Sequence, residues 1–122
     1  MGRLPASGPL VVEDDPRIAA VLVKGLRKQG FEADWVTTGG EALERCRSGE
    51  VGLLLLDLGM PDIDGLDVLR ALVGAMPPVI VITARSDPRD RATALELGAA
   101  SYFTKPFAWS DIWSAVRAAL VP

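Results

Sequence analysis

Short apolar runs and longer amphipathic segments alternate along this chain. One apolar run covers residues 51–56 and reads Val-Gly-Leu-Leu-Leu-Leu without a polar interruption. A continuous run of this kind is typical of a strand buried on both faces, as in a parallel sheet. Shorter runs, and one alternating segment that contains Trp35, complete the pattern. The predicted strands are residues 10–12, 32–36, 51–56, 78–83 and 101–104.

The segments between these strands carry apolar residues at helical spacing. Asp15 precedes Pro16, which predicts a helix with the acid as N-cap and the proline at its first position. Thr38 is a suitable cap for the next helix, and several glycines are placed to end helices. The predicted helices are one that begins at Pro16 and stops at Gly30, then 40–47 closed by Gly49, 66–73, 89–97 closed by Gly98, and 109–120.

Strand and helix alternate five times, an order that implies a parallel sheet with helices on both faces. The 122 residues suffice for one domain with a single core. Residues 1–9 are rich in proline, glycine and small side chains, and Pro9 fits only the first position of a strand. We therefore expect a loose leader over residues 1–9, a domain over residues 10–120, and a tail or tag remnant at residues 121–122.

The charge balance narrows the class of function. Thirteen basic and sixteen acidic residues give a net charge of −3, which argues against a nucleic-acid-binding surface on this domain. The single cysteine, Cys46, cannot form an internal disulfide and suits a reducing compartment. The sequence contains no histidine, which excludes histidine-ligated metals and a Ser-His-Asp triad. No apolar stretch reaches the roughly 20 residues of a membrane span, so we expect a cytoplasmic protein.

Four predicted strands end in a polar group. The first ends in Glu13 and Asp14, the third in Asp57, the fourth in Thr83, and the fifth in Lys105. Because the carboxyl ends of parallel strands share one edge of the sheet, these side chains should converge there.

The three carboxylates need a counter-charge. Two carboxylates about 4 Å apart repel by about 4 kcal/mol at an effective dielectric near 20. Mg²⁺ is usually held by one or two carboxylates, a carbonyl and waters. We expect Asp14 and Asp57 to bind Mg²⁺ directly, Glu13 to act through water, and the backbone carbonyl of Gly59 to supply a further oxygen.

The same residues suit phosphoryl transfer, which requires mainly positioning and charge stabilisation. Asp57 would be the nucleophile and phosphoacceptor, because a carboxylate is already deprotonated at neutral pH. Lys105 would place a positive charge on a phosphoryl oxygen, and Thr83 would donate a hydrogen bond to it.

Four segments resemble the receiver domain of a bacterial two-component response regulator, in the order and spacing of that family. They are residues 10–15 (Leu-Val-Val-Glu-Asp-Asp), 56–65 (Leu-Asp-Leu-Gly-Met-Pro-Asp-Ile-Asp-Gly), 82–85 (Ile-Thr-Ala-Arg) and 102–107 (Tyr-Phe-Thr-Lys-Pro-Phe). The resemblance implies an α/β, flavodoxin-like (βα)5 doubly wound sheet with strand order 2-1-3-4-5. It also implies Mg²⁺-dependent transfer of a phosphoryl group from the phosphohistidine of a sensor histidine kinase to Asp57, with Mn²⁺ as a plausible substitute.

Further features follow from the same resemblance. Thr83, Ala84 and Tyr102 would bind the phosphoryl group and act as a switch, and the Lys105–Pro106 bond would be cis. Residues 83–102 look most like the winged-helix (OmpR/PhoB-type) subfamily, which implies control of transcription through a DNA-binding domain that these 122 residues do not contain. The domain would be a phosphoacceptor switch rather than an enzyme, able to catalyse its own phosphorylation and dephosphorylation.

That subfamily dimerises through the face formed by the fourth helix, fifth strand and fifth helix. Two acidic residues usual in the fifth strand are here Ala100 and Ser101, which weakens the expectation of such a homodimer. Trp109 and Trp113 are unusual replacements on the fifth helix and form either an apolar partner surface or core at the helix edge. The candidate interface residues are Arg91, Trp109, Asp111, Trp113 and Arg117.

Other functions remain to be weighed. A receiver-like interaction module that works without phosphorylation is the main alternative, although the acceptor, the acids and the lysine are all present. A flavodoxin would need a Ser/Thr-rich phosphate loop where Glu13 and Asp14 stand. A phosphatase with an aspartyl intermediate would need a second Asp at position 59, where this chain has glycine. The acidic cluster could also be only a helix N-terminal feature.

Overall fold

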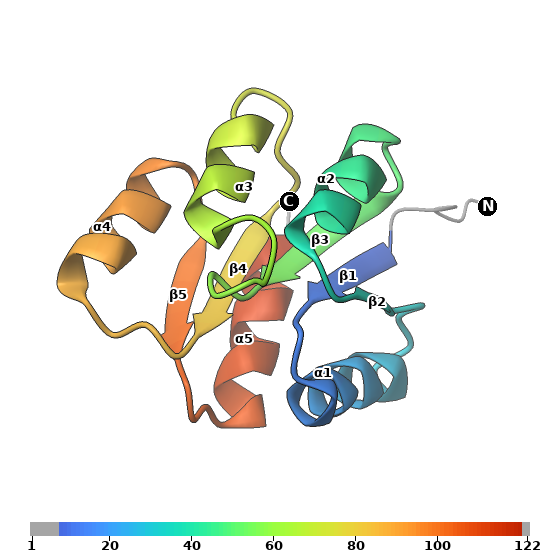
Figure 1. Ribbon diagram of the computed structural model, residues 1–122. Helices are drawn as coiled ribbons and strands as arrows, with labels where there is room; N and C mark the ends of the chain where they lie inside the picture. Colours follow the sequence, from blue (N-terminus) through green and yellow to red (C-terminus); the bar gives the residue numbers. More distant parts are fainter. Residues whose placement is uncertain (1–7, 121–122) are drawn as a thin grey trace.

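Five strands and five helices alternate strictly in the computed structural model, which describes residues 8–120 (Figure 1). The predicted leader residues 1–7 and tail residues 121–122 lie outside the described residues. The strands are β1 (Gly8–Val12), β2 (Asp34–Val36), β3 (Val51–Leu56), β4 (Val79–Thr83) and β5 (Ser101–Thr104). The helices are α1 (Pro16–Lys28), α2 (Gly39–Arg47), α3 (Gly65–Leu72), α4 (Pro88–Glu96) and α5 (Trp109–Leu120).

All five strands are parallel and lie in the order β2-β1-β3-β4-β5. This order confirms the predicted flavodoxin-like fold. The chain leaves β1 toward β2 on one side and returns to β3 on the other, so the strand order reverses at β1. In open α/β sheets, ligands bind in the crevice outside the carboxyl ends of the strands at this reversal.

Helices cover both faces of the sheet. Figure 1 shows α2, α3 and α4 on one face and α1 and α5 on the other. In β3, Leu54 and Leu56 pack in the cluster under α2, α3 and α4, whereas Leu53 and Leu55 pack in the cluster under α1 and α5. Each of these four leucines is at most 1% exposed. Burial on both faces explains why β3 is a continuous apolar run rather than an alternating one.

Side-chain caps fix where the helices begin. Asp15 accepts a hydrogen bond from the Arg17 amide, and Thr38 accepts one from the Glu41 amide, as the sequence predicted for α1 and α2. Asp64 caps α3 in the same way. Its capping places the start of α3 at Gly65, one residue before the predicted start.

Three strand boundaries differ from the prediction, the smallest difference being that β4 begins at Val79 rather than at residue 78. β1 begins at Gly8 rather than near Leu10, so Pro9 lies inside the strand instead of at its first position. The register between β1 and β3 shifts between Gly8 and Pro9, and such an irregularity accommodates a residue that cannot donate a ladder hydrogen bond. β2 is shorter than predicted and begins at Asp34. Among residues 8–120, no helix is long and apolar enough to cross a membrane.

Gly65 allows α3 to start directly against the end of β3. A Cβ at this position would lie 2.5 Å from Leu58 Cα and 3.0 Å from the Asp57 carbonyl oxygen. These are backbone atoms that cannot move aside cheaply. Close approach therefore requires glycine here.

We predict that Gly65→Ala lowers the free energy of unfolding by about 1–3 kcal/mol in urea denaturation, because overpacking displaces the Asp57–Leu58 backbone. Gly59→Ala is the matched control, since its Cβ would meet only Asp57 Oδ1 at 3.9 Å, and its change should stay within about 0.5 kcal/mol. A Gly65→Ala protein as stable as the wild type would contradict this packing.

Candidate functional site

Lys105 joins the ends of two strands by bonding to both of their carboxylates. Its Nζ lies 2.8 Å from Glu13 Oε1, after β1, and 2.8 Å from Asp57 Oδ2, after β3. Glu13 and Asp57 are buried, and the Lys105 side chain is 16% exposed. Breaking such a buried pair by removing one partner is costly, because an unpaired charge stays behind. The structure thus brings together three residues that the sequence separates by more than 40 positions.

Asp14 completes an acidic cluster with the two bridged residues. Glu13, Asp14 and Asp57 each offer one carboxylate oxygen, and these oxygens all lie within 4.8 Å of one another. Asp14 is exposed, so the cluster is open to solvent on one side. Three carboxylates face a single ammonium group, and an oxygen-rich set with excess negative charge fits a hard divalent cation. The residues present therefore fit Mg²⁺.

Gly59 lies beside Asp57. Its amide donates a hydrogen bond of 3.0 Å to Asp57 Oδ1, the oxygen that Lys105 does not hold. Because Gly59 has no side chain, it does not cover the carboxylate of Asp57. The expected metal contact through the Gly59 carbonyl stays a prediction.

Burial and hydrogen bonding act differently on the two buried acids. Burial raises the pKa of Glu13 to about 7, and the bonds from Lys105 and the Asp15 amide offset only part of this rise. Burial also acts on Asp57, but bonds from Lys105 and the Gly59 amide outweigh it and hold its pKa below the ordinary value. Burial tends to lower the pKa of Lys105, yet its two carboxylate partners raise it. Asp57 is therefore the more reliably ionised of the two buried acids near neutral pH.

The predicted switch residues meet at the connection between β4 and α4. The hydroxyl oxygen of Thr83 accepts a hydrogen bond of 3.3 Å from the Arg85 amide. The hydroxyl of Tyr102 donates a bond of 2.9 Å to the Arg85 carbonyl oxygen, and the Tyr102 side chain is buried. Both switch residues are thus bonded to the main chain of one loop residue. Ala84 lies between Thr83 and Arg85, and the Lys105–Pro106 peptide bond is cis.

Arg85 also connects this loop to the loop that follows Asp57. Its guanidinium pairs with the carboxylate of Asp64 and reaches the carbonyl oxygen of Leu58 at 3.5 Å. The sequence pattern indicated Arg85 only as part of a motif and did not predict this role. The available signal was an arginine that comes shortly after one strand, together with an acid that follows the neighbouring strand and precedes a helix. Only the adjacency of β3 and β4 makes them partners.

Asp62 is a second residue that the sequence analysis did not assign. Its two carboxylate oxygens accept hydrogen bonds from the Gly39 amide at 2.8 Å and the Gly40 amide at 2.9 Å. These amides form the start of α2, where a negative charge is favourable. The loop after β3 is thereby attached to a neighbouring helix.

The candidate interface residues of α4 and α5 make contacts within the chain. Arg91 donates a hydrogen bond of 3.3 Å to the Tyr102 carbonyl oxygen, and its guanidinium lies 6.0 Å from the Tyr102 ring centroid. Arg117 lies 5.6 Å from the ring centroid of Trp113. Asp111 is exposed in the first turn of α5. The structure therefore brings Arg91 to Tyr102 within the chain, and the interface between two chains stays a prediction.

Trp109 and Trp113 pack between α5 and α1. Their rings stack with centroids 6.3 Å apart, and Trp113 meets the ring of Phe31 edge-on at 6.2 Å. A Cβ at Gly25 of α1 would come within 2.7 Å of the Trp109 ring. Both tryptophans are partly buried and belong to the edge of the core, one of the two interpretations that the sequence left open.

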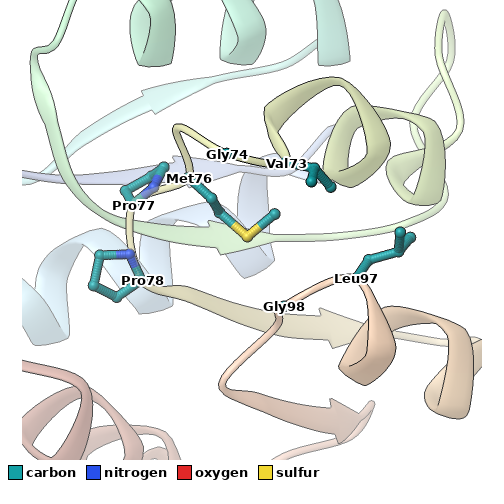
Figure 2. A pocket seen from close by; sticks show the side chains of 7 residues that line it. All are labelled: Val73, Gly74, Met76, Pro77, Pro78, Leu97 and Gly98. Carbon is teal, nitrogen blue, oxygen red and sulfur yellow. The ribbon is translucent and has the colours of Figure 1, made fainter.

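A hollow lies at the opposite end of β4 from Thr83. Figure 2 shows it between the connection that precedes β4 and the turn that follows α4. Its lining contains no charged or hydroxyl side chain, so it offers no chemistry comparable to the acidic cluster. The lining residues are Val73, Gly74, Met76, Pro77, Pro78, Leu97 and Gly98.

Comparison with known sequences gives one consistent match. The family model of the response regulator receiver domain matches residues 10–117. Transcriptional activator protein IrlR from Burkholderia pseudomallei is 43% identical over 112 residues, which cover 91% of this chain and 49% of that protein. Transcriptional regulatory protein KdpE from Mycobacterium tuberculosis is 39% identical over 112 residues, covering 91% and 50% respectively. The chain spans about half the length of the curated relatives that it matches.

Comparison with solved structures agrees. Response regulator protein TrrA from Thermotoga maritima, solved in complex with Mg²⁺-BeF, has a TM-score of 0.83 and is 32% identical. The match covers 93% of this chain and 99% of that one. The non-phosphorylated HemR receiver domain from Leptospira biflexa has a TM-score of 0.86 and is 28% identical, with 95% of each chain covered.

The raised pKa of Glu13 predicts a pH-dependent stability of the metal-free protein. A carboxyl group whose pKa is about 7 when folded and 4.5 when unfolded binds more protons in the folded state. Its contribution is therefore fully present at low pH and lost as pH rises through about 7. The charge of Asp57 does not change over this pH range, because its pKa is lowered from 3.8.

In EDTA, the wild type should lose about 1–3 kcal/mol of unfolding free energy relative to Glu13→Gln between about pH 5 and pH 8. Urea denaturation of both proteins across this range measures the difference. Asp67→Asn is a suitable control, since Asp67 is an exposed α3 carboxylate that pairs only with Arg70 among residues 8–120. A wild-type minus Glu13→Gln difference that is constant with pH would contradict the buried charge cluster.

Proposed function

The chain belongs to the response regulator receiver domain family, and we propose that it accepts a phosphoryl group on Asp57 in a Mg²⁺-dependent reaction. The donor would be the phosphohistidine of a sensor histidine kinase. We propose that the domain predicted over residues 10–120 starts at Gly8, where β1 begins. The lone Cys46 and the expected kinase partner favour a cytoplasmic reaction.

One observation carries the proposal: Lys105 bonds to both Asp57 and Glu13 at 2.8 Å beside a cluster of three carboxylate oxygens. From this position the lysine can pair first with the carboxylate of the acceptor and then with the phosphoryl group that the acceptor carries. The cluster retains unbalanced negative charge after the lysine is counted. This is the charge arrangement that a divalent cation and an incoming phosphoryl group require.

Each residue has a defined task in the proposed reaction. An oxygen of Asp57 attacks the phosphorus of the donor, a P–O bond forms, the P–N bond of the phosphohistidine breaks, and the imidazole leaves with the electron pair. Lys105 holds Asp57 in place and then pairs with a phosphoryl oxygen, while Thr83 donates a hydrogen bond to another. Asp14, Asp57 and the Gly59 carbonyl would hold the metal, with Glu13 acting through water. Mg²⁺ supplies positive charge that offsets the carboxylates and the phosphoryl oxygens; Mn²⁺ has the same ligand preferences.

Arg85 supports the coupling of this reaction to the α4-β5-α5 face. The hydroxyl of Thr83 is bonded to the Arg85 amide, and that of Tyr102 to the Arg85 carbonyl. If Thr83 turns toward a phosphoryl group, its bond to the Arg85 amide is lost and the loop beneath Tyr102 is released. Arg91 of α4 contacts Tyr102 and would respond to this movement.

We propose that the output is control of transcription through a DNA-binding domain outside these residues. The support is the similarity to two transcriptional regulators, of which this chain covers about half. We keep the homodimer through α4, β5 and α5 as a proposal, with Asp111 as its exposed charged group. Phosphorylation of this kind is a switch, and the only catalysis that we propose is of the domain's own phosphorylation and dephosphorylation. An interaction module without phosphorylation is not favoured, because acceptor, acids and lysine converge in one site.

Intact-mass measurement with acetyl phosphate tests the acceptor. With Mg²⁺, the wild type should gain one phosphoryl group, and Asp57→Ala should gain none, because the nucleophile is gone. EDTA should abolish the gain, since the cluster then lacks its counter-charge. Sedimentation velocity on the phosphorylated sample reports the proposed dimer at the same time.

Asp67→Asn is the matched control and should be phosphorylated like the wild type, and circular dichroism checks that Asp57→Ala is folded. Phosphorylation of Asp57→Ala at the wild-type level would show that Asp57 is not the acceptor. Equal gain in Mg²⁺ and EDTA would contradict the metal requirement.

A further inference from the structure

We infer that Trp35, on the edge strand β2, is a positioning residue for the carboxylate of Asp14. The indole Nε1–H of Trp35 donates a hydrogen bond of 2.6 Å to the backbone carbonyl oxygen of Glu13. That carbonyl belongs to the peptide unit between Glu13 and Asp14. The bond therefore fixes the orientation of the peptide plane from which the Asp14 side chain projects. The inference rests on the proposed Mg²⁺ site.

Residues of β2 bond to both the amide and the carbonyl of Glu13. The Glu13 amide donates a hydrogen bond of 3.1 Å to the Val36 carbonyl oxygen, which continues the pairing of β1 with β2. The Glu13 carbonyl then accepts the bond from the Trp35 side chain. Main chain and side chain of β2 thus hold both polar groups of one residue. A residue has only two soft backbone torsions, so bonds at both its amide and its carbonyl restrict Glu13 strongly.

Asp14 depends on its backbone more than the other acids do. Lys105 holds the carboxylates of Glu13 and Asp57 directly. Among residues 8–120, no ion pair or side-chain hydrogen bond holds the carboxylate of Asp14, which is exposed. Its place beside the other two oxygens is therefore set by the peptide before it. This makes the Trp35 bond relevant to metal affinity rather than to folding alone.

The nature of Trp35 supports this role. Tryptophan carries a single polar group, an N–H that can only donate. Trp35 is 37% exposed, so much of its surface remains in contact with water. A large apolar ring left half exposed on an edge strand gains less from burial than a core residue does. The bond to Glu13 is the contact that accounts for a tryptophan at this place.

Isothermal titration calorimetry with MgCl₂ tests the inference on the wild type, Trp35→Phe and Trp113→Phe. Trp35→Phe keeps an aromatic ring and removes the N–H donor, so Mg²⁺ should bind about 3- to 10-fold more weakly, as expected for one lost hydrogen bond. Trp113→Phe is the matched control, since Trp113 packs against Phe31 and Trp109 away from the site, and its affinity should stay within about twofold.

A kinetic readout separates positioning from stability. With acetyl phosphate, the initial phosphorylation rate of Trp35→Phe should be low at limiting Mg²⁺ and return to the wild-type rate at saturating Mg²⁺. A defect in overall structure would lower the rate at every Mg²⁺ concentration and would overturn the inference.

Hydrogen exchange of the unmodified protein gives an independent test without metal. The indole N–H of Trp35 should exchange with solvent at least about tenfold more slowly than that of a free indole, although the ring is partly exposed. Exchange at the free rate would overturn the inference. Equal Mg²⁺ affinity of the wild type and Trp35→Phe would also overturn the inference, and it would leave the proposed function intact. A wild type that binds no Mg²⁺ would overturn both.

Discussion

The ammonium group of Lys105 is the constraint on which the site depends. It bonds to Glu13 and Asp57, two buried carboxylates from neighbouring strands that would otherwise repel each other at the sheet edge. Without it, burial would favour protonation of both acids. With it, the pKa of Asp57 stays below its ordinary value, while burial still raises the pKa of Glu13 to about 7. The protein thus keeps Asp57 ionised beside a charge imbalance that a divalent cation can relieve.

The sequence predicted the sheet and its reactive edge because both leave strong local signals. An uninterrupted apolar run followed by Asp57 indicates a doubly buried strand and its carboxyl end, and caps such as Asp15 and Thr38 mark the helix starts. The boundaries were less accurate where long-range pairing overrides a local rule. Pro9 lies within β1 because the register with β3 shifts beside it, and no local pattern encodes that shift.

The contacts that the sequence did not reveal all join segments that are far apart along the chain. Arg85 pairs with Asp64 only because β4 lies beside β3. Trp35 bonds to the Glu13 carbonyl only because β2 lies beside β1. Trp109 shows the converse. Its sequence context allowed either a partner surface or core, and the missing side chain of Gly25 on a distant helix places it against α1. Residue type and spacing thus predicted that the acids and Lys105 converge at one edge of the sheet, whereas contacts such as that of Arg85 with Asp64 required the fold.

If the three carboxylates bind a divalent cation, paramagnetic broadening by Mn²⁺ reports this binding directly. On adding substoichiometric Mn²⁺ to ¹⁵N-labelled protein, the amide signals of Glu13, Asp14 and Asp57 should broaden first. Signals near Gly98, beside the hollow at the opposite end of β4, should remain sharp (Figure 2). Excess Mg²⁺ should restore the broadened signals by competition. Broadening centred on any other part of the domain, or none at these three residues, would contradict the account.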